Sequence, residues 1–340
     1  LLVIMASGLI GASVGLNQTD KFRVAAESAA GLEVLGEHFP AGEAQPMIIV
    51  ANTGEVPAVV AAAEGIDGVI RVTPVSESRD ASLTRILVTG EPAPSTPESL
   101  ALVEQLRAAV HDIDGADALV GGVVATDVDA RAGNTRDLLV IAPLVLLVSF
   151  IVLLVLLRSL VAPVLLMLVN LLSAVAAIGG GAWLSRVLFD QPALDLQVPL
   201  LSFLFLVALG IDYTIFLVHR ARAEAQAFGT KRGMVEAVAG TGGVITSAGI
   251  VLAAVFAALG VLPLVTLGQI GLIVGLGVIV DTFVVRTIMV PAIFSLVGDR
   301  IWWPGRIPGG SRAPGAAPSD GRAAGGGESE HVEHSEAALT

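Results

Sequence analysis

Five runs of roughly 20 apolar residues constrain this chain more than any other feature of its sequence. A helix of about 20 residues is the length that crosses about 30 Å of hydrocarbon. The composition agrees, because 54% of the residues are hydrophobic and 15% are charged, whereas soluble domains average about 25% charged residues. The sequence therefore predicts an α-helical polytopic membrane bundle, with spans near residues 138–157, 163–184, 198–218, 243–263 and 268–296.

The first 16 residues, LLVIMASGLIGASVGL, are also apolar and lead directly into a polar region. They are shorter than a complete span, so we interpret residues 1–16 as part of a sixth transmembrane helix. A signal peptide is the alternative interpretation. It is disfavoured because no basic residues precede the apolar core and the small-residue cleavage pattern is poor.

Residues 17–137 are polar enough to fold in water and combine helical with extended patterns. A first helix is predicted at KFRVAAESAAGLEVLGEHF, and short β-branched runs predict strands at MIIVAN, GVIRVTPV and TRILVTG. A capping-box pattern begins the amphipathic stretch STPESLALVEQLRAAVHDI. The expected order is helix, strand, helix, strand, strand, helix, strand, which indicates an inserted α/β domain. No proline separates it from the span at Leu138, so a nearly continuous helix should join domain and membrane.

Lysine and arginine in short loops set the expected orientation. The loop after residue 218 contains three arginines and one lysine near the membrane, and the segment after the last span contains four arginines, so these regions should lie in the cytoplasm. Counting spans backwards places residues 17–137 and 185–197 on the outer side. Residues 304–340 are rich in Gly, Pro, Ala and Ser without apolar periodicity, which is typical of disorder. The expected divisions are a partial first helix (1–16), an extracytoplasmic α/β domain (17–137), a five-helix bundle (138–298) and a disordered cytoplasmic tail (299–340).

Charge and motif content exclude several classes of function. Residues 17–137 hold 19 acidic and 8 basic residues of a chain whose net charge is −12, and an acidic surface argues against nucleic-acid binding. The chain has no cysteine, which excludes thiolate metal sites and cysteine nucleophiles. It also has no GxxxxGK[ST] or HExxH motif. We therefore expect a protein that is not an enzyme and that uses no cofactor or metal ion.

A carboxylate interrupts the apolar stretch ALGIDYTIFLVHR at residues 208–220. Asp212 follows the start of its run at Val198 by about 14 residues, or about 21 Å along a helix. Asp281 lies about 13 residues beyond the start of its own run at Gly268. Both runs should cross from outside to inside, so the two carboxylates should lie at nearly the same depth. Ionisable groups at such depth are costly and usually mark ion paths.

Two hypotheses for Asp212 remain open. In the first, it carries protons, because desolvation favours the neutral form of a carboxyl group. Tyr213 is the only tyrosine in the chain, and its hydroxyl could hydrogen-bond that neutral form. In the second, Asp212 pairs with a basic group and only holds two helices together. The candidate proton relay is therefore Asp212 with Tyr213.

Asp281 and Arg286 are expected to support the bundle as intramembrane ion pairs. They lie five residues apart, which separates them by about 140° around an α-helix. We therefore expect no direct pair between them, and a partner for each on another span. Thr246 and Ser247 are candidates for polar lining, although hydroxyl groups in spans often bond the carbonyl of the preceding turn.

Two further features concern packing and the membrane surface. Gly271 and Gly275 lie four residues apart, and small residues at this spacing let helices approach closely. His219 lies about two turns below Asp212, beside Arg220 at the expected membrane edge. We interpret it as an exposed interfacial histidine.

Three stretches resemble the last three spans of the mycobacterial-membrane-protein-large (MMPL) transporters, of the resistance-nodulation-division superfamily: GIDYTIFLVHR, AVAGTGGVITSAGIVLAAVFAAL and LGQIGLIVGLGVIVDTFVVRTIMVPAIFSLVGDRIWWP. The resemblance extends from residue 1 to about residue 304, and residues 17–137 are similar to the family's second porter domain. Family members have two similar halves, each with one span, an outer porter domain and five further spans. They export lipids or other hydrophobic compounds by using the proton gradient.

The resemblance implies roles for individual residues. Asp212 and Tyr213 correspond to the family's proton-relaying Asp-Tyr pair, Arg220 to a basic residue that follows it, and Asp281 and Arg286 to the acid and base of the last span. The implied partners are a lipid or hydrophobic substrate, protons, the bilayer of the cell membrane, and the family's first half. That half would bring a second Asp-Tyr pair, which this sequence lacks. The chain then corresponds to the C-terminal half of a transporter.

Two other functions remain open. The chain could be a non-transporting membrane scaffold or sensor, whose outer domain binds a partner and whose buried charges only stabilise the bundle. It could also be a Sec-associated export factor of the same superfamily, which carries intramembrane Asp and Arg but differs in its outer domain and span motifs. An exporter requires Asp212 to exchange protons, whereas a scaffold tolerates asparagine there.

Overall fold

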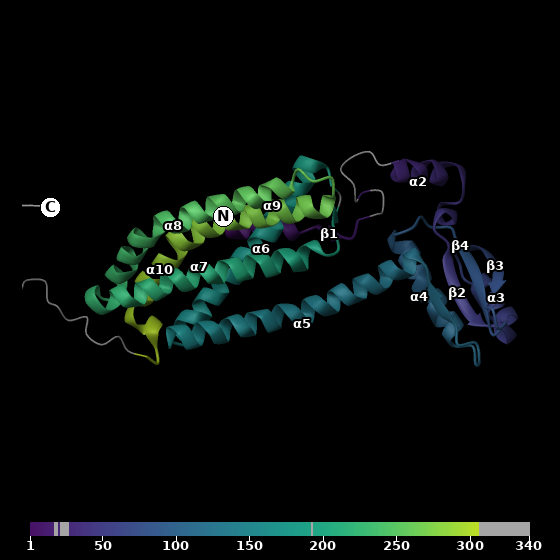
Figure 1. The fold of residues 1–340 in the computed structure, drawn as a ribbon, viewed down its shortest axis with the longest axis horizontal. Coiled ribbons are helices and arrows are strands. Elements are labelled where there is room, and N and C mark those ends of the chain that lie inside the picture. Colours follow the sequence, from purple (N-terminus) through teal and green to yellow (C-terminus); the bar gives the residue numbers. More distant parts are fainter. Residues whose placement is uncertain (17–19, 21–26, 192, 306–340) are drawn as a thin grey trace, which may run out of the picture.

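The computed structural model describes residues 1–16, 20, 27–191 and 193–305. Figure 1 shows a bundle of long helices and, beyond one end of it, a smaller α/β domain; a single long helix, α5, connects the two. The start of the first predicted outer helix, at residues 21–26, and residues 306–340 of the predicted tail lie outside the described residues. The beginning of that tail, predicted to be disordered from residue 299, instead forms a helical turn that buries Ile301 and Trp302.

Five helices in the described part of the chain are long and apolar enough to cross a membrane. They contain four of the five predicted apolar runs and most of the fifth, at 243–263, so the helical membrane bundle is confirmed. The last span is not uniform, because a π-helical segment, η5, interrupts it. The spans are α5 (Val123–Leu157), α6 (Val161–Phe189), α7 (Val198–Phe228), α8 (Thr230–Leu259), and a last one made of α9 (Val265–Val280), η5 (Asp281–Met289), α10 (Val290–Val297) and η6 (Gly298–Trp302).

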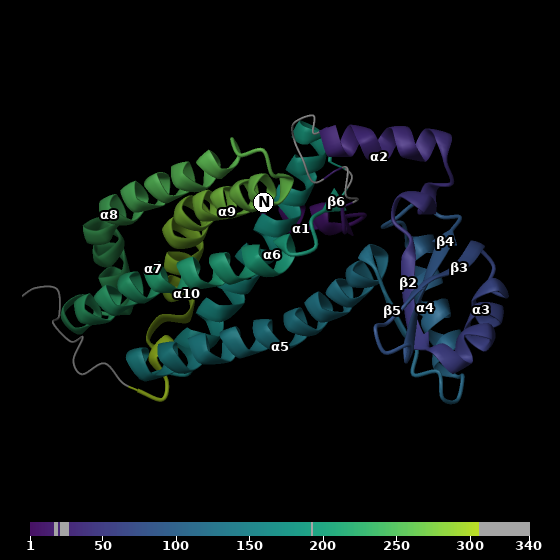
Figure 2. The ribbon, with the colours of Figure 1, turned by 45° about the vertical axis from the view of Figure 1, so that its right-hand side comes forward.

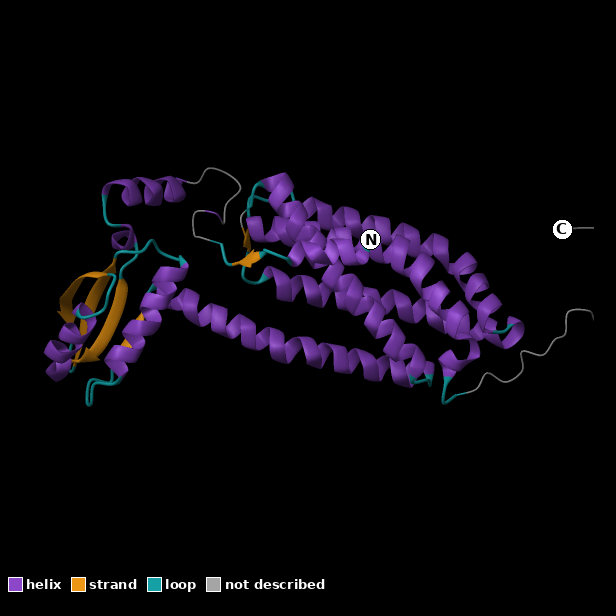
Figure 3. Cartoon of the chain, turned by 180° about the vertical axis from the view of Figure 1, so that it is seen from behind, coloured by secondary structure: helices purple, strands orange, loops and turns teal. Residues whose placement is uncertain are grey.

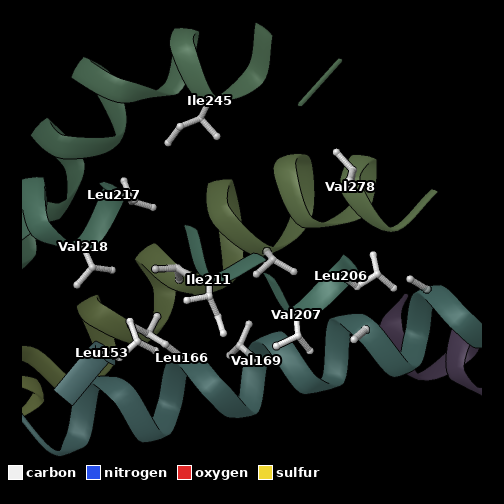
Figure 4. Packing of buried hydrophobic residues seen from close by; sticks show 14 of the residues in the cluster. Leu153, Leu166, Val169, Leu206, Val207, Ile211, Leu217, Val218, Ile245 and Val278 are labelled. Carbon is white, nitrogen blue, oxygen red and sulfur yellow. The ribbon is translucent and has the colours of Figure 1, made fainter. Parts of the chain in front are cut away.

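The centre of the bundle is formed by α6, α7 and the last span. In the most apolar part of the last span 61% of the residues are buried, against 6% in α5, which therefore lies at the edge. Figure 4 shows the central packing, where Val207 and Ile211 of α7 approach Val169 of α6. The predicted close approach is also found, because a Cβ at Gly271 would overlap the backbone oxygen of Phe256 on α8.

The α/β domain contains one four-stranded antiparallel sheet in the order β3-β4-β2-β5 (Figure 2). Buried residues alternate along β2, so one face of the sheet packs against α3 and α4 while the other stays exposed. The predicted order of elements is confirmed. The elements are α2 (Glu27–His38), β2 (Met47–Asn52), α3 (Val56–Glu64), β3 (Val69–Glu77), β4 (Leu83–Gly90), α4 (Pro97–His111) and β5 (Leu119–Gly121).

The predicted helix that joins the α/β domain to the membrane is also confirmed. α5 begins inside the domain and ends at Leu157, at the far end of the bundle. Polar contacts fix its first turns to the domain. Arg107 of α4 donates to both carboxylate oxygens of Asp129, at 2.6 and 2.9 Å, and Ser95 donates to Asp127 at 2.5 Å. The start of α5 should therefore move together with the domain.

The first 16 residues lie along α6, starting with the short helix α1 (Leu2–Ala6). The two-residue strands β1 (Ser13–Val14) and β6 (Ala193–Leu194) then pair in parallel at the end of the bundle nearest the α/β domain (Figure 3). Gln269 of α9 is fully buried there. It donates to the carbonyl of Ala193 at 2.9 Å and accepts from the backbone N–H of Asp195 at 2.8 Å, which fastens the α6–α7 loop.

The opposite end of the bundle holds the α7–α8 turn at Gly229 and the end of the last span. Trp302 is buried and donates from its indole nitrogen to Thr230 at 3.0 Å, and Thr230 donates to Asp299 at 2.6 Å. The regions predicted to be cytoplasmic thus meet at one end, and those predicted to be external meet at the other.

Cysteine labelling tests this orientation in a chain that has no cysteine of its own. Arg79, beyond β3, and Ala227, near the end of α7, are both exposed. We expect an impermeant maleimide to label Arg79→Cys in intact spheroplasts and Ala227→Cys only after permeabilisation, because short-loop Lys and Arg keep the second site inside. Labelling of Ala227→Cys but not Arg79→Cys in intact spheroplasts would reverse the orientation.

Candidate functional site

A small polar cavity lies between α6, α7 and the last span, in the middle of the bundle. Its volume of about 10 Å³ is enough for roughly one water molecule. The polar residues that line it include Asn170 and Ser173 from α6, Tyr213 from α7, and Asp281 and Arg286 from η5. Three of the residues predicted from the sequence therefore meet at one place.

Asp281 and Arg286 form a direct ion pair within one span. Both are buried, with 7% and 4% of their surface exposed. The prediction that each pairs with another span is therefore wrong. It assumed an α-helix, but residues 281–289 form a π-helix, in which i→i+5 hydrogen bonds bring residues five apart onto one face. Thr287 shows the same spacing, because its hydroxyl donates to the carbonyl of Thr282 at 3.0 Å.

The Arg286 guanidinium connects this pair to α7. It donates to the backbone oxygen of Leu209 at 3.3 Å, and it lies over the ring of Tyr213, 4.4 Å from the centroid. A cation over an aromatic face is attracted by the ring, more strongly where water is excluded. Two of its nitrogens, Nε and Nη1, have no hydrogen-bond partner among the described residues. Tyr213 therefore packs against the pair through its ring, and its hydroxyl makes no hydrogen bond in the described part of the chain.

Asp212 lies on a different face of α7 from this cavity. It is exposed, and it forms no ion pair or hydrogen bond with any residue that the structure describes. Exposed residues recur along α7 at helical spacing on both sides of it, so that they form one stripe. We call this the Asp212 stripe; its members are Phe205, Ala208, Asp212 and Phe216. Asp212 and Tyr213 are thus neighbours in sequence that face different surroundings.

The remaining predicted residues lie away from the cavity. Arg220 forms an i,i+4 ion pair with Glu224 at 2.6 Å and is 57% exposed, so it does not pair inside the bundle. Ser247 is exposed and donates to the carbonyl of Val244 at 3.0 Å, while Thr246 is half-buried. Neither α8 hydroxyl lines the central cavity.

Sequence reasoning missed Asn170 and Ser173. Asn170 is buried in α6 and donates to the backbone oxygen of Val207 on α7 at 3.3 Å. A Cβ at Gly210 would overlap the Asn170 amide, so the contact depends on glycine at that position. The signal was available, because Asn170 is the one amide in the apolar run VAPVLLMLVNLL.

Residues 22–316 match the MMPL family. The chain belongs to the MMPL family. It is 42% identical over 290 residues to ActII-3 of Streptomyces coelicolor, 33% identical over 294 residues to the apo-petrobactin exporter of Bacillus anthracis, and 37% identical over 240 residues to MmpL9 of Mycobacterium tuberculosis.

These matches cover 85%, 82% and 68% of this chain but 40%, 39% and 24% of the three relatives. The chain therefore spans well under half the length of these three proteins. Membership of this family, together with the five long apolar helices, makes it a multi-pass protein of the cell membrane.

Replacing Gly210 with alanine tests the approach of α6 to α7. The added methyl group would displace Asn170, and overpacking of this kind destabilises by about 1–3 kcal/mol. Gly240 is the matched control, because nothing lies within 4 Å of a Cβ built there on α8. We expect Gly210→Ala to lower the thermal unfolding temperature in detergent and Gly240→Ala to leave it unchanged or slightly higher. Equal temperatures for the two variants would contradict the packing described here.

Replacing Arg286 with alanine should destabilise the bundle, because it leaves Asp281 buried without its counter-charge. Breaking a buried pair in this way costs about 3–5 kcal/mol. Arg232→Ala, at an exposed arginine of α8, is the control and should be nearly neutral. The double variant Asp281→Leu, Arg286→Met removes both charges and should recover much of the unfolding temperature. If the double variant is as unstable as Arg286→Ala, the loss comes from packing and not from the unpaired acid.

Proposed function

We propose that this chain forms the C-terminal half of a proton-driven exporter of lipids or other hydrophobic compounds, in which Asp212 and Tyr213 relay the proton. Asp281 and Arg286 hold the relay helix in place, and a first half of the same kind covers the Asp212 stripe. Residues 1–16 would then belong to a sixth span, and residues 17–137 would form the outer porter domain.

The observation that supports this proposal most strongly is the exposure of Asp212 about halfway along α7. A bare carboxylate that faces hydrocarbon is costly, and such residues normally face a protein interior or a water-filled cavity. The described residues supply neither a cation nor a hydrogen bond to this side chain. We therefore infer that another segment covers the stripe, and the first half of a family member is the segment that we propose.

The two acids within the spans differ in what balances their charge. Asp281 has Arg286 beside it, so the two charges neutralise each other and the pair needs no proton. Asp212 has no counter-charge among the described residues, so away from water it becomes neutral only when it binds a proton. Binding a proton from the outer side and releasing it to the inner side would therefore move one charge per cycle through Asp212. The hydroxyl of Tyr213 is free to donate or accept along this path.

A helical connection to the α/β domain would let the proton cycle drive substrate movement. α5 runs as a single helix, with Pro143 inside it, from that domain to the far end of the bundle. Arg131 of α5 donates to the carbonyl of Val14 at 3.1 Å, and β1 pairs with β6 of the α6–α7 loop. A shift of α7 against its neighbours would therefore reach the domain through both α5 and this loop.

The relatives support export as the activity. One of them is named an apo-petrobactin exporter, and another is named as a transport protein. We extend transport to this chain because its match to the exporter covers 82% of its residues. The class of substrate, a lipid or another hydrophobic compound, rests on the family resemblance alone.

Replacing Asp212 with asparagine is the direct test. The neutral amide has a similar shape, so we expect the two-half transporter that contains this chain to insert and fold normally and to lose proton-driven efflux in vesicles. Tyr213→Phe keeps the ring under Arg286 and removes only the hydroxyl, so a partial loss of efflux is expected.

Abundance and thermal unfolding of each variant are measured beside efflux, and Thr246→Val serves as a control that removes an α8 hydroxyl outside the cavity. A scaffold would tolerate asparagine at position 212. Normal efflux by Asp212→Asn vesicles would show that the residue only joins helices and that the relay lies elsewhere.

A further inference from the structure

A second, larger cavity lies at the end of the bundle that the sequence assigns to the cytoplasm. Its volume is about 330 Å³, within the range of about 300–1,000 Å³ that is usual for sites of small ligands. It lies between the last turn of α5, the α5–α6 turn and α7, whose ends approach each other in Figures 1 and 2. The lining residues are Leu156, Arg158, His219, Arg222, Ala223 and Gln226.

The depth of this cavity matches the headgroup layer of the inner leaflet. α7 begins at Val198 and has 31 residues, whereas about 20 residues cross the hydrocarbon. The hydrocarbon part of α7 should therefore end near Val218, one residue before His219. Arg222 donates to the backbone oxygen of Leu157, which places the end of α5 at the same level.

The charge of the cavity is positive. Two arginines and a histidine line it, and its lining contains no carboxylate. Glu224, the nearest acid along α7, pairs with Arg220 instead. Within the described residues Arg158 and His219 form no ion pair, so the charge of Arg158 and the hydrogen-bonding groups of both side chains remain available to a ligand.

The arrangement of the two arginines is fixed by the backbone and by packing. Arg158 ends α5 in the left-handed region, at φ 45° and ψ 43°, and only two residues separate it from α6. The Arg222 guanidinium lies 5.7 Å from the ring centroid of Trp302, in addition to its bond to Leu157. Trp302 is itself buried and bonded to Thr230, so Arg222 is held in place before any ligand arrives.

We propose that this cavity binds the phosphate-bearing headgroup of an anionic lipid from the cytoplasmic leaflet. Basic pockets between transmembrane helices on the cytoplasmic side suit such headgroups, and the arginine fork matches phosphate oxygens in two hydrogen bonds. A lipid fits better than free phosphate because Leu156, and beyond it the exposed apolar side of α5, continue from the cavity toward the hydrocarbon. The bound headgroup joins the inner end of α5 to α7.

This site shares no residue with the proposed proton relay. Lipid binding here can therefore be tested without any assumption about transport. The headgroup links the helix that leads to the α/β domain with the helix that holds Asp212. Anionic lipid should therefore stabilise the bundle through contacts that the central ion pair does not make.

Native mass spectrometry of the purified two-half transporter that contains this chain tests the proposal, because the mass of the adduct identifies what is bound. The probes are phosphatidylglycerol, phosphatidylcholine and inorganic phosphate, each titrated against that transporter in detergent. A basic residue near anionic lipid contributes about 1 kcal/mol, or about fivefold in affinity. We therefore expect Arg158→Gln to weaken phosphatidylglycerol binding about fivefold and Arg158→Gln combined with His219→Gln to weaken it further.

Arg232→Gln removes a basic residue at the same end of the bundle but outside the cavity, and it should leave phosphatidylglycerol binding unchanged. Circular dichroism and unfolding temperature confirm that each variant is folded. Equal weakening by Arg158→Gln and Arg232→Gln would overturn the site, since it would show only general attraction to the surface. Equal affinity for phosphatidylcholine, or for inorganic phosphate alone, would overturn the assignment of an anionic lipid.

Discussion

The ion pair between Asp281 and Arg286 is the interaction on which the centre of the bundle depends. Two charges in a water-poor interior are tolerated only when they neutralise each other, and here one turn of π-helix brings them together. The same arginine covers the ring of Tyr213 and bonds the backbone of α7. The pair therefore fixes the position of α7 against the last span, and with it the direction in which Asp212 points.

The outer and inner ends are fixed by different contacts. At the outer end Gln269 fastens the α6–α7 loop, and the loop pairs with residues 13–14 through β6. At the inner end Trp302 packs against Phe294 and bonds Thr230. α5 reaches both ends but is mostly exposed, so its position depends on these terminal contacts more than on the core. Such a helix can transmit movement between the bundle and the α/β domain.

The sequence predicted the spans, the order of elements in the α/β domain and the continuous α5, because each follows from hydrophobic periodicity and run length. The relation of Asp281 to Arg286 could not be predicted in the same way, since an α-helical period places residues five apart on different faces. The exposure of Asp212 could not be predicted either, because a lone acid in an apolar run does not reveal which face of the helix is covered by other helices. Asn170 was visible as a polar residue in an apolar run, but its proximity to Tyr213 depends on Gly210, which only tertiary packing reveals.

The central claim is that Asp212, and not Asp281, exchanges protons. Infrared difference spectra of the transporter, recorded between two pH values, report directly on carboxyl groups that gain or lose a proton. We expect a protonated-carboxyl band that appears on acidification, disappears in Asp212→Asn and persists in a folded variant in which Asp281 and Arg286 are both replaced by apolar residues. A band that is unchanged in Asp212→Asn and absent without Asp281 would contradict the account.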